Sequence, residues 1–313
     1  MPFPSDEVLM KTAGDLVAQL QALFGKHPGF RATHAKGELL SGTFTPSAEA
    51  KKLSSAAHFN NASTPVWVRF SNSTGIPNIP DNDSNADPRG IAIRFILGPH
   101  KHTDVIGHST PFFPTHTGGQ FLEMLQAIAA SPPDAEHPSA IEKFLGANPT
   151  ALAFVTAPKP PPVSYATEQY WSVSAFKLIA ADGTAKFIRY HVVPDAGVSI
   201  LDGEAVKAKA ADYLQKELSA RLATGAIGFK ILAQVAEDGD VTDNATVHWP
   251  ESRKVVELGS FTLEGIVPDN VKEQKQVIFD PIPRVEGVEP SDDPLLEIRA
   301  AIYLISGKQR RAA

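Results

Sequence analysis

The chain has 313 residues, which is enough for one large domain or two ordinary ones and for a core that encloses a small molecule. Its net charge is −6, and its one basic run is 308–311, so its charge gives no sign of binding nucleic acid or an anionic membrane. It has no cysteine, which excludes disulfides, thiolate catalysis and thiolate metal sites. Its N-terminus lacks the pattern of a secretory signal, and no apolar stretch approaches about eighteen residues. We therefore expect a cytoplasmic protein whose partners are small molecules.

The first third of the chain predicts one helix and then strands. Apolar residues at helical spacing predict a helix over 6–24, capped by Ser5 and ended by Gly25. We expect this helix to serve packing or subunit contact. Short apolar runs between Gly37 and Phe95 predict strands joined by turns. The polar loop 72–88 contains three prolines and is expected to be a surface excursion rather than a site.

The rest of the chain alternates between helical and strand patterns. Helices are predicted near 118–130, 139–145 and 204–222, and strands near 169–180, 186–193, 227–236 and 254–264. The proline cluster 157–162 predicts an extended connection within one domain. A final helix is predicted after Asp292-Asp293-Pro294. Strands with helices segregated between them indicate an α+β fold.

The final helix carries the first chemical signal. Arg299 and Tyr303 are four residues apart, so both side chains lie on one helix face, where the guanidinium can hold the phenol as phenolate. A phenolate is a metal ligand, and tyrosinate ligation of iron marks catalase-type haem. The run from Arg299 to Tyr303 resembles the Arg-x-Phe-x-Tyr proximal motif of haem catalases. Alone, the pair is better explained by a surface ion beside a half-buried phenol.

A second motif lies near the other end of the chain. The run Arg31-Ala32-Thr33-His34-Ala35-Lys36-Gly37 matches the catalase distal motif Arg-x-x-His-Ala-x-Gly. Segments that also resemble catalases follow in the family's order: 68–71, 87–95, 104–113, 176–178, 249–250, 279–281 and 287–291. The resemblance covers about residues 30–311. By these motifs the chain is identified as a member of the haem catalase superfamily, of the short type called catalase-related peroxidase.

The resemblance implies an architecture and a cofactor. The expected fold is an eight-stranded antiparallel β-barrel with helices, without the C-terminal helical domain of full-length catalases. We expect an N-terminal helical arm at 1–29 and a single haem domain at 30–313. The implied cofactor is haem b with Tyr303 as its axial tyrosinate. The N-terminal arm is short and the family's C-terminal helical region is missing, and these parts normally form the tetramer contacts. We therefore expect a monomer or a small homo-oligomer.

The resemblance also assigns roles to individual residues. His34 would move the proton during peroxide cleavage, and Ser71 would fix the tautomer and tilt of its imidazole. A second set would bind the haem: Arg31, Arg69 and Arg310 at the propionates, Arg299 beside the axial ligand, and Phe121 as the phenylalanine over the ring.

One position departs from the family. Catalases carry asparagine where this chain has His108, and that amide helps to orient the second hydrogen peroxide. His108 could still take part in peroxide activation, but we expect weak catalase activity. The expected function is a peroxidase of the oxidative stress response that reduces hydrogen peroxide or organic peroxides with a small organic electron donor.

Three other interpretations remain open. The first is rearrangement of lipid hydroperoxides, as in allene oxide synthases of the same superfamily, and the second is a haem-binding barrel without turnover. The third, a haem-free structural descendant, is disfavoured because Tyr303, Arg299, His34 and three candidate propionate arginines are all retained.

Overall fold

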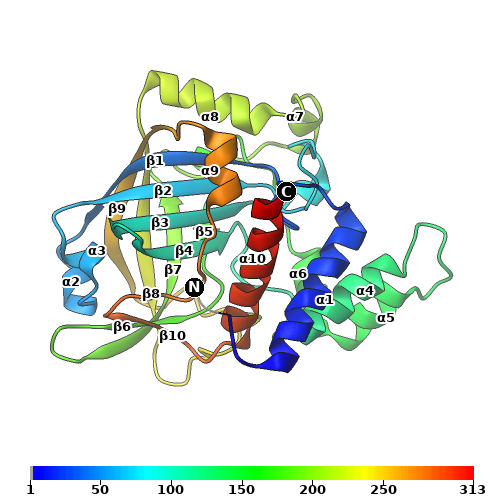
Figure 1. Ribbon diagram of the computed structural model, residues 1–313, viewed down its shortest axis with the longest axis horizontal. Coiled ribbons are helices and arrows are strands. Elements are labelled where there is room, and N and C mark those ends of the chain that lie inside the picture. The colour runs from blue at the N-terminus through cyan, green and yellow to red at the C-terminus, as the bar shows by residue number, and fades with distance from the viewer. Residues whose placement is uncertain (1–2) are drawn as a thin grey trace.

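The computed structural model describes residues 3–313. Within this range, eight antiparallel strands form a closed barrel, because the last strand of the ring pairs back with the first (Figure 1). Their order around the barrel is β7 (Ala185–Pro194), β5 (Tyr170–Trp171), β4 (Lys101–His108), β3 (Gly90–Gly98), β2 (Thr64–Ser71), β1 (Gly37–Pro46), β9 (Val255–Ile266) and β8 (Ile227–Val235). Two short strands, β6 (Phe176–Ile179) and β10 (Val288–Pro290), extend the sheet from β7. The predicted α+β fold with an eight-stranded barrel is confirmed.

The strands separate apolar from polar side chains by alternation, as residues in a strand point to opposite faces. In β2, Val66, Val68 and Phe70 lie in the buried barrel core. The intervening residues point outward, and the ladder places Ser71 opposite Gly90, which is itself opposite His108. The outer face of β2, β3 and β4 therefore carries the polar residues that the sequence singled out.

Three helices pack on one side of this barrel and form a second apolar cluster with one another (Figure 1). They are α1 (Glu7–Phe24), α4 (Gly118–Ala129) and α10 (Pro294–Ala312). The remaining helices are α2 (Ala50–Leu53), α3 (Ala57–Asn60), α5 (Ala140–Ala147), α6 (Pro149–Thr156), α7 (Gly203–Lys207), α8 (Tyr213–Thr224) and α9 (Asn270–Gln276). In the part of the chain from residue 3 onward, no helix is both long and apolar enough to cross a membrane.

Two details of the predicted helices are wrong. The cap of α1 is Asp6 rather than Ser5, because its carboxylate accepts hydrogen bonds from the amides of Val8 and Leu9. The helix predicted over 204–222 is two helices, α7 and α8. Between them the carbonyl of Ala211 accepts hydrogen bonds from the Lys36 ammonium and from the amide of Asp81, so tertiary contacts replace the helical ones.

The loop 72–88 is not the surface excursion that its polarity predicted. Asn72 and Asp81 are fully buried and bonded to each other at 2.8 Å. Buried Arg89 donates to the Asn72 side chain at 2.6 Å, and Lys36 forms a 2.7 Å ion pair with Asp81. Polar side chains that satisfy one another can be buried, so this loop packs behind the motif that contains His34.

Candidate active site

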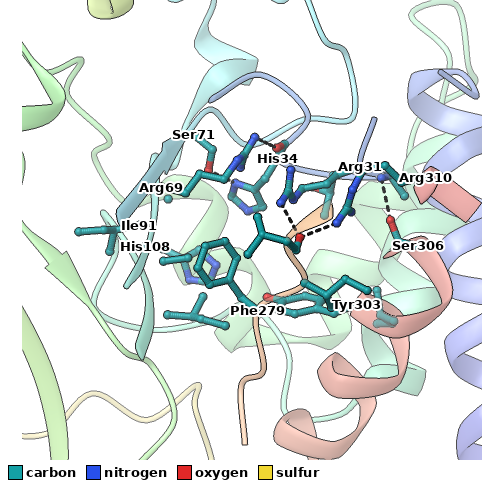
Figure 2. Close-up of a pocket in the computed structure, with 18 of the residues that line it drawn as sticks. Arg31, His34, Arg69, Ser71, Ile91, His108, Phe279, Tyr303, Ser306 and Arg310 are labelled. Carbon is teal, nitrogen blue, oxygen red and sulfur yellow. Dashed lines mark hydrogen bonds between the residues drawn. The ribbon is translucent and has the colours of Figure 1, made fainter. Parts of the chain in front are cut away.

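A cavity lies between the outer face of β2, β3 and β4 and the helix α10. His34, Ser71 and His108 line one side, and Tyr303 lies across from them on α10 (Figure 2). The two motifs at opposite ends of the sequence therefore meet at one cavity.

The His34 imidazole is held by contacts on several sides. Its backbone has a left-handed φ of 55°, and its amide donates to the carbonyl of Ser73 at 2.9 Å. Its Nδ1 lies 3.1 Å from the Ser71 hydroxyl oxygen. A side chain at Gly90 would place its Cβ 3.0 Å from the ring, so glycine there leaves room for the imidazole.

Both histidines at this cavity are neutral near pH 7. Burial, reinforced by the charge of Arg69, lowers the pKa of His34 from 6.5 to about 3. Burial, with His34 as the next cause, lowers the pKa of His108 well below its usual value. The two rings stack with their centroids 5.8 Å apart and their planes at 22°. Two uncharged imidazoles can each accept or donate a proton.

The opposite side presents a phenol. The Tyr303 hydroxyl accepts a long hydrogen bond from Arg299, at 3.4 Å, and the Arg299 guanidinium carbon lies 5.8 Å from the phenol ring centre. Asp293 fixes the start of α10 by accepting from the amide of Leu295. The expected pair on one helix face is present in the structure.

One edge of the cavity carries three arginines: Arg69 and Arg310, which are buried, and Arg31, which is partly buried. Their hydrogen bonds go to neutral acceptors, such as the carbonyls of His34 and Val277. Among residues 3–313, no carboxylate forms an ion pair with any of the three. Burial is the largest cause that lowers each pKa, to about 10 for Arg69 and Arg310, and the charges of neighbouring arginines add to it. The three arginines at this edge can therefore bind anionic groups of a ligand.

A second cavity adjoins the first and shares His34, His108 and Tyr303 with it. Its other walls are mostly apolar. Phe121 of α4 lines this second cavity, with its ring 5.2 Å from that of Phe113, and not the arginine edge. Together the two cavities run from a cationic end, between His34 and Tyr303, to an apolar end.

These residues fit the haem that the sequence resemblance implies. Haem has two carboxylates at one edge and an apolar macrocycle, which matches a cavity with three arginines at one end and apolar walls at the other. A phenol on one side supplies the oxygen ligand expected for ferric iron, and imidazoles on the other side supply proton carriers.

Sequence patterns did not reveal the apolar wall of the site. Leu16, Leu20 and Phe24 of α1 line the second cavity, although the sequence suggested that this helix only packs or contacts a subunit. Apolar residues on a helix stripe look the same whether they face a core or a cofactor. The strand register, which comes from the structure, places Gly90 between Ser71 and His108.

Comparison with known proteins agrees with the fold and with the family that the motifs indicate. A sequence model of the family described as Catalase matches residues 19–313. A catalase-related peroxidase of Mycolicibacterium paratuberculosis is 36% identical over 304 residues, covering 96% of this chain and 95% of that protein. A catalase-related peroxidase of Synechococcus elongatus is 30% identical over 303 residues, covering 96% and 88%. A fungal catalase structure aligns with a TM-score of 0.81 at 22% identity, covering 95% of this chain and 63% of that chain, and supports the fold.

Proposed function

The chain belongs to the catalase family, and we propose that it is a haem-dependent peroxidase that reduces hydrogen peroxide or organic peroxides with a small organic electron donor. The observation that carries this proposal is a single cavity with His34 on one side, Tyr303 on the other and three arginines at one edge. Relatives named catalase-related peroxidase over nearly the whole chain support it.

Haem b would be held by residues at both the edge and the face of the cavity. Arg31, Arg69 and Arg310 would bind its propionates, since an arginine fork matches a carboxylate and these three lack an acidic partner among the described residues. Tyr303 would be the axial ligand as tyrosinate, and Arg299 donates a hydrogen bond to the same oxygen. Bound haem supplies the redox centre at which peroxide is cleaved and donors are oxidised.

His34 would move the proton that peroxide cleavage requires. Because its imidazole is neutral, it can accept the proton of the incoming peroxide. Burial and the charge of Arg69 disfavour the imidazolium, so the proton would return promptly to the departing oxygen, which leaves as water or an alcohol. The Ser71 hydroxyl at Nδ1 would hold the ring in the orientation that this transfer needs. Two donor molecules then each supply one electron and one proton.

His108 would make the reaction favour donor oxidation over oxygen evolution. Its ring occupies the place where catalases have an asparagine, and it stacks on His34. A second hydrogen peroxide must be positioned accurately to act as the reductant, and a bulky ring beside His34 changes how it is held. The apolar adjoining cavity, which reaches the same two histidines, favours organic peroxides and aromatic donors.

An absorption spectrum of the haem-loaded protein tests the proposal, with Tyr303→Phe as the variant and Tyr190→Phe as the control. Tyr190 is buried in the barrel, away from the cavity. We expect a ferric tyrosinate spectrum in wild type and in Tyr190→Phe that is lost in Tyr303→Phe. We also expect peroxide-dependent oxidation of a phenolic donor that exceeds oxygen evolution.

Three outcomes would redirect the interpretation. A spectrum unchanged by Tyr303→Phe removes the axial ligand assignment. A tyrosinate spectrum that does not respond to peroxide supports a haem-binding barrel without turnover. Conversion of a fatty-acid hydroperoxide to an epoxide with no donor consumed supports the rearrangement chemistry of allene oxide synthases.

A further inference from the structure

A tryptophan lies just behind the wall of the cavity. Trp171 belongs to β5, the two-residue strand between β4 and β7, and its ladder partners are His108 and His191. Directly paired residues in an antiparallel ladder point to the same face, so Trp171 follows His108 in the row on the outer face of the barrel. Gly107 lines the cavity, and a Cβ there would lie 2.8 Å from the carbonyl oxygen of Trp171. Trp171 therefore neighbours two residues that line the cavity, His108 by strand pairing and Gly107 by backbone contact.

The indole of Trp171 is placed where it can lose an electron and a proton. It is partly exposed, and among residues 3–313 neither a hydrogen bond of its N–H nor a cation over its ring is present. The nearest aromatic partner is His191, with ring centres 6.3 Å apart. Burial, followed by the charge of His248, lowers the pKa of His191 to about 4, so this neighbour is uncharged near pH 7. An exposed N–H can pass its proton to water.

Two other oxidisable side chains, Tyr170 and Trp249, lack these properties. Tyr170 is fully buried and donates its hydroxyl to the carbonyl of Tyr165 at 3.0 Å, and a neutral carbonyl cannot take its proton. Trp249 is buried, its N–H is bonded to the carbonyl of Val241, and the Arg189 cation lies 4.5 Å from its ring centre. A cation over an indole opposes removal of an electron from that ring.

We propose that Trp171 is a second oxidation site, at the surface, for aromatic donors too large to enter the cavity. The inference rests on the proposed peroxidase function, because peroxide is the oxidant that removes two electrons from the haem-loaded cavity. Trp171 returns one electron to the site and releases its indole proton to water. A phenol at the surface then gives one electron and one proton back to the indole and leaves as a phenoxyl radical. A second phenol repeats the step, so two phenols are oxidised for each peroxide reduced to water.

The test measures how the haem-loaded protein oxidises two substrates that carry the same phenol. One is the free phenol, and the other is that phenol coupled to a dextran polymer. The variant is Trp171→Phe, and the matched control is Trp67→Phe. Trp67 is also partly buried and packs beside Ala92 and Ile106 of the cavity wall, but its ladder partner is Arg94. We expect Trp171→Phe to lower kcat/KM for the polymer by at least about tenfold. The same variant should change kcat/KM for the free phenol by no more than about twofold. Trp67→Phe should change neither.

A readout independent of turnover locates the radical. After peroxide is added with a nitroso spin trap and no donor, peptide mass spectrometry should find the adduct on Trp171, and the adduct should be absent from Trp171→Phe. The inference is overturned if wild type oxidises the free phenol but not the polymer. It is also overturned if Trp171→Phe oxidises both equally well, or if the adduct lies on another residue. If wild type oxidises neither phenol, the peroxidase proposal itself fails.

Discussion

A histidine inside the barrel should weaken the protein in acid. His58 is 1% exposed, and its ring lies 4.0 Å from that of Phe59 and 4.6 Å from that of Phe95, centre to centre. Its Nδ1 has no hydrogen-bond partner among the described residues. Because a charge at this position would be surrounded by apolar rings, burial lowers the pKa of His58 from 6.5 to about 3.

The sign and size of the loss of stability in acid follow from the difference between the pKa of His58 in the unfolded and in the folded chain. Below pH 6.5 the unfolded chain binds a proton at His58, and the folded chain does not until about pH 3. Since the unfolded state binds more protons, the free energy of unfolding falls as pH drops through this window. The loss is about 1.4 kcal/mol per pH unit, or about 2 kcal/mol between pH 7 and pH 5.

Urea unfolding at pH 7 and pH 5 measures this loss in wild type, in His58→Leu and in the control His100→Asn. His100 is exposed and has φ 58°, a conformation that asparagine also adopts readily. The pH 7 to pH 5 loss should be smaller by about 2 kcal/mol in His58→Leu and unchanged in His100→Asn. His34 and His108 are present in all three proteins, so their contributions cancel. Equal losses in His58→Leu and wild type would refute the reasoning, and donor oxidation at pH 7 should be the same in all three.

Three further predictions concern the site. Gly90→Ala would bring a Cβ within 3.0 Å of the His34 ring, so peroxide reduction measured by stopped flow should slow by at least about tenfold while the haem spectrum is retained. His108→Asn should raise the ratio of oxygen evolved to donor oxidised, measured with an oxygen electrode and a phenol in parallel; an unchanged ratio would contradict the assigned effect of His108. Arg310→Leu should weaken haem binding, measured by titration, by about 1.5 to 3 kcal/mol, whereas exposed Arg311→Leu should not.

The sequence predicted the parts of the site whose chemistry is distinctive. His34, Tyr303 and the arginines stood out because they fall in motifs that follow one another in the order found in catalases, and that resemblance placed them in one site. The structure brings them together across one cavity. Their roles in binding and catalysis remain predictions that the experiments above address.

What the sequence could not predict depends on tertiary contacts. The break between α7 and α8 exists because Lys36 and Asp81, far away in the sequence, take the hydrogen bonds of Ala211. The loop 72–88 is buried because Asn72 and Arg89 satisfy each other's polar groups. Local composition shows polar residues but not the partners that bury them.

The register of the barrel links the candidate site to the surface. Ser71, Gly90, His108 and Trp171 occupy one row across neighbouring strands, each directly opposite the next. A shift of one residue in any of these strands would turn its member of the row into the barrel core. The same pairing that places a hydroxyl beside His34 therefore also places an indole behind the cavity wall. Substitutions that disturb this register should impair the oxidation of small and large donors together. Loss of the indole alone should impair the oxidation of large donors and spare that of small ones.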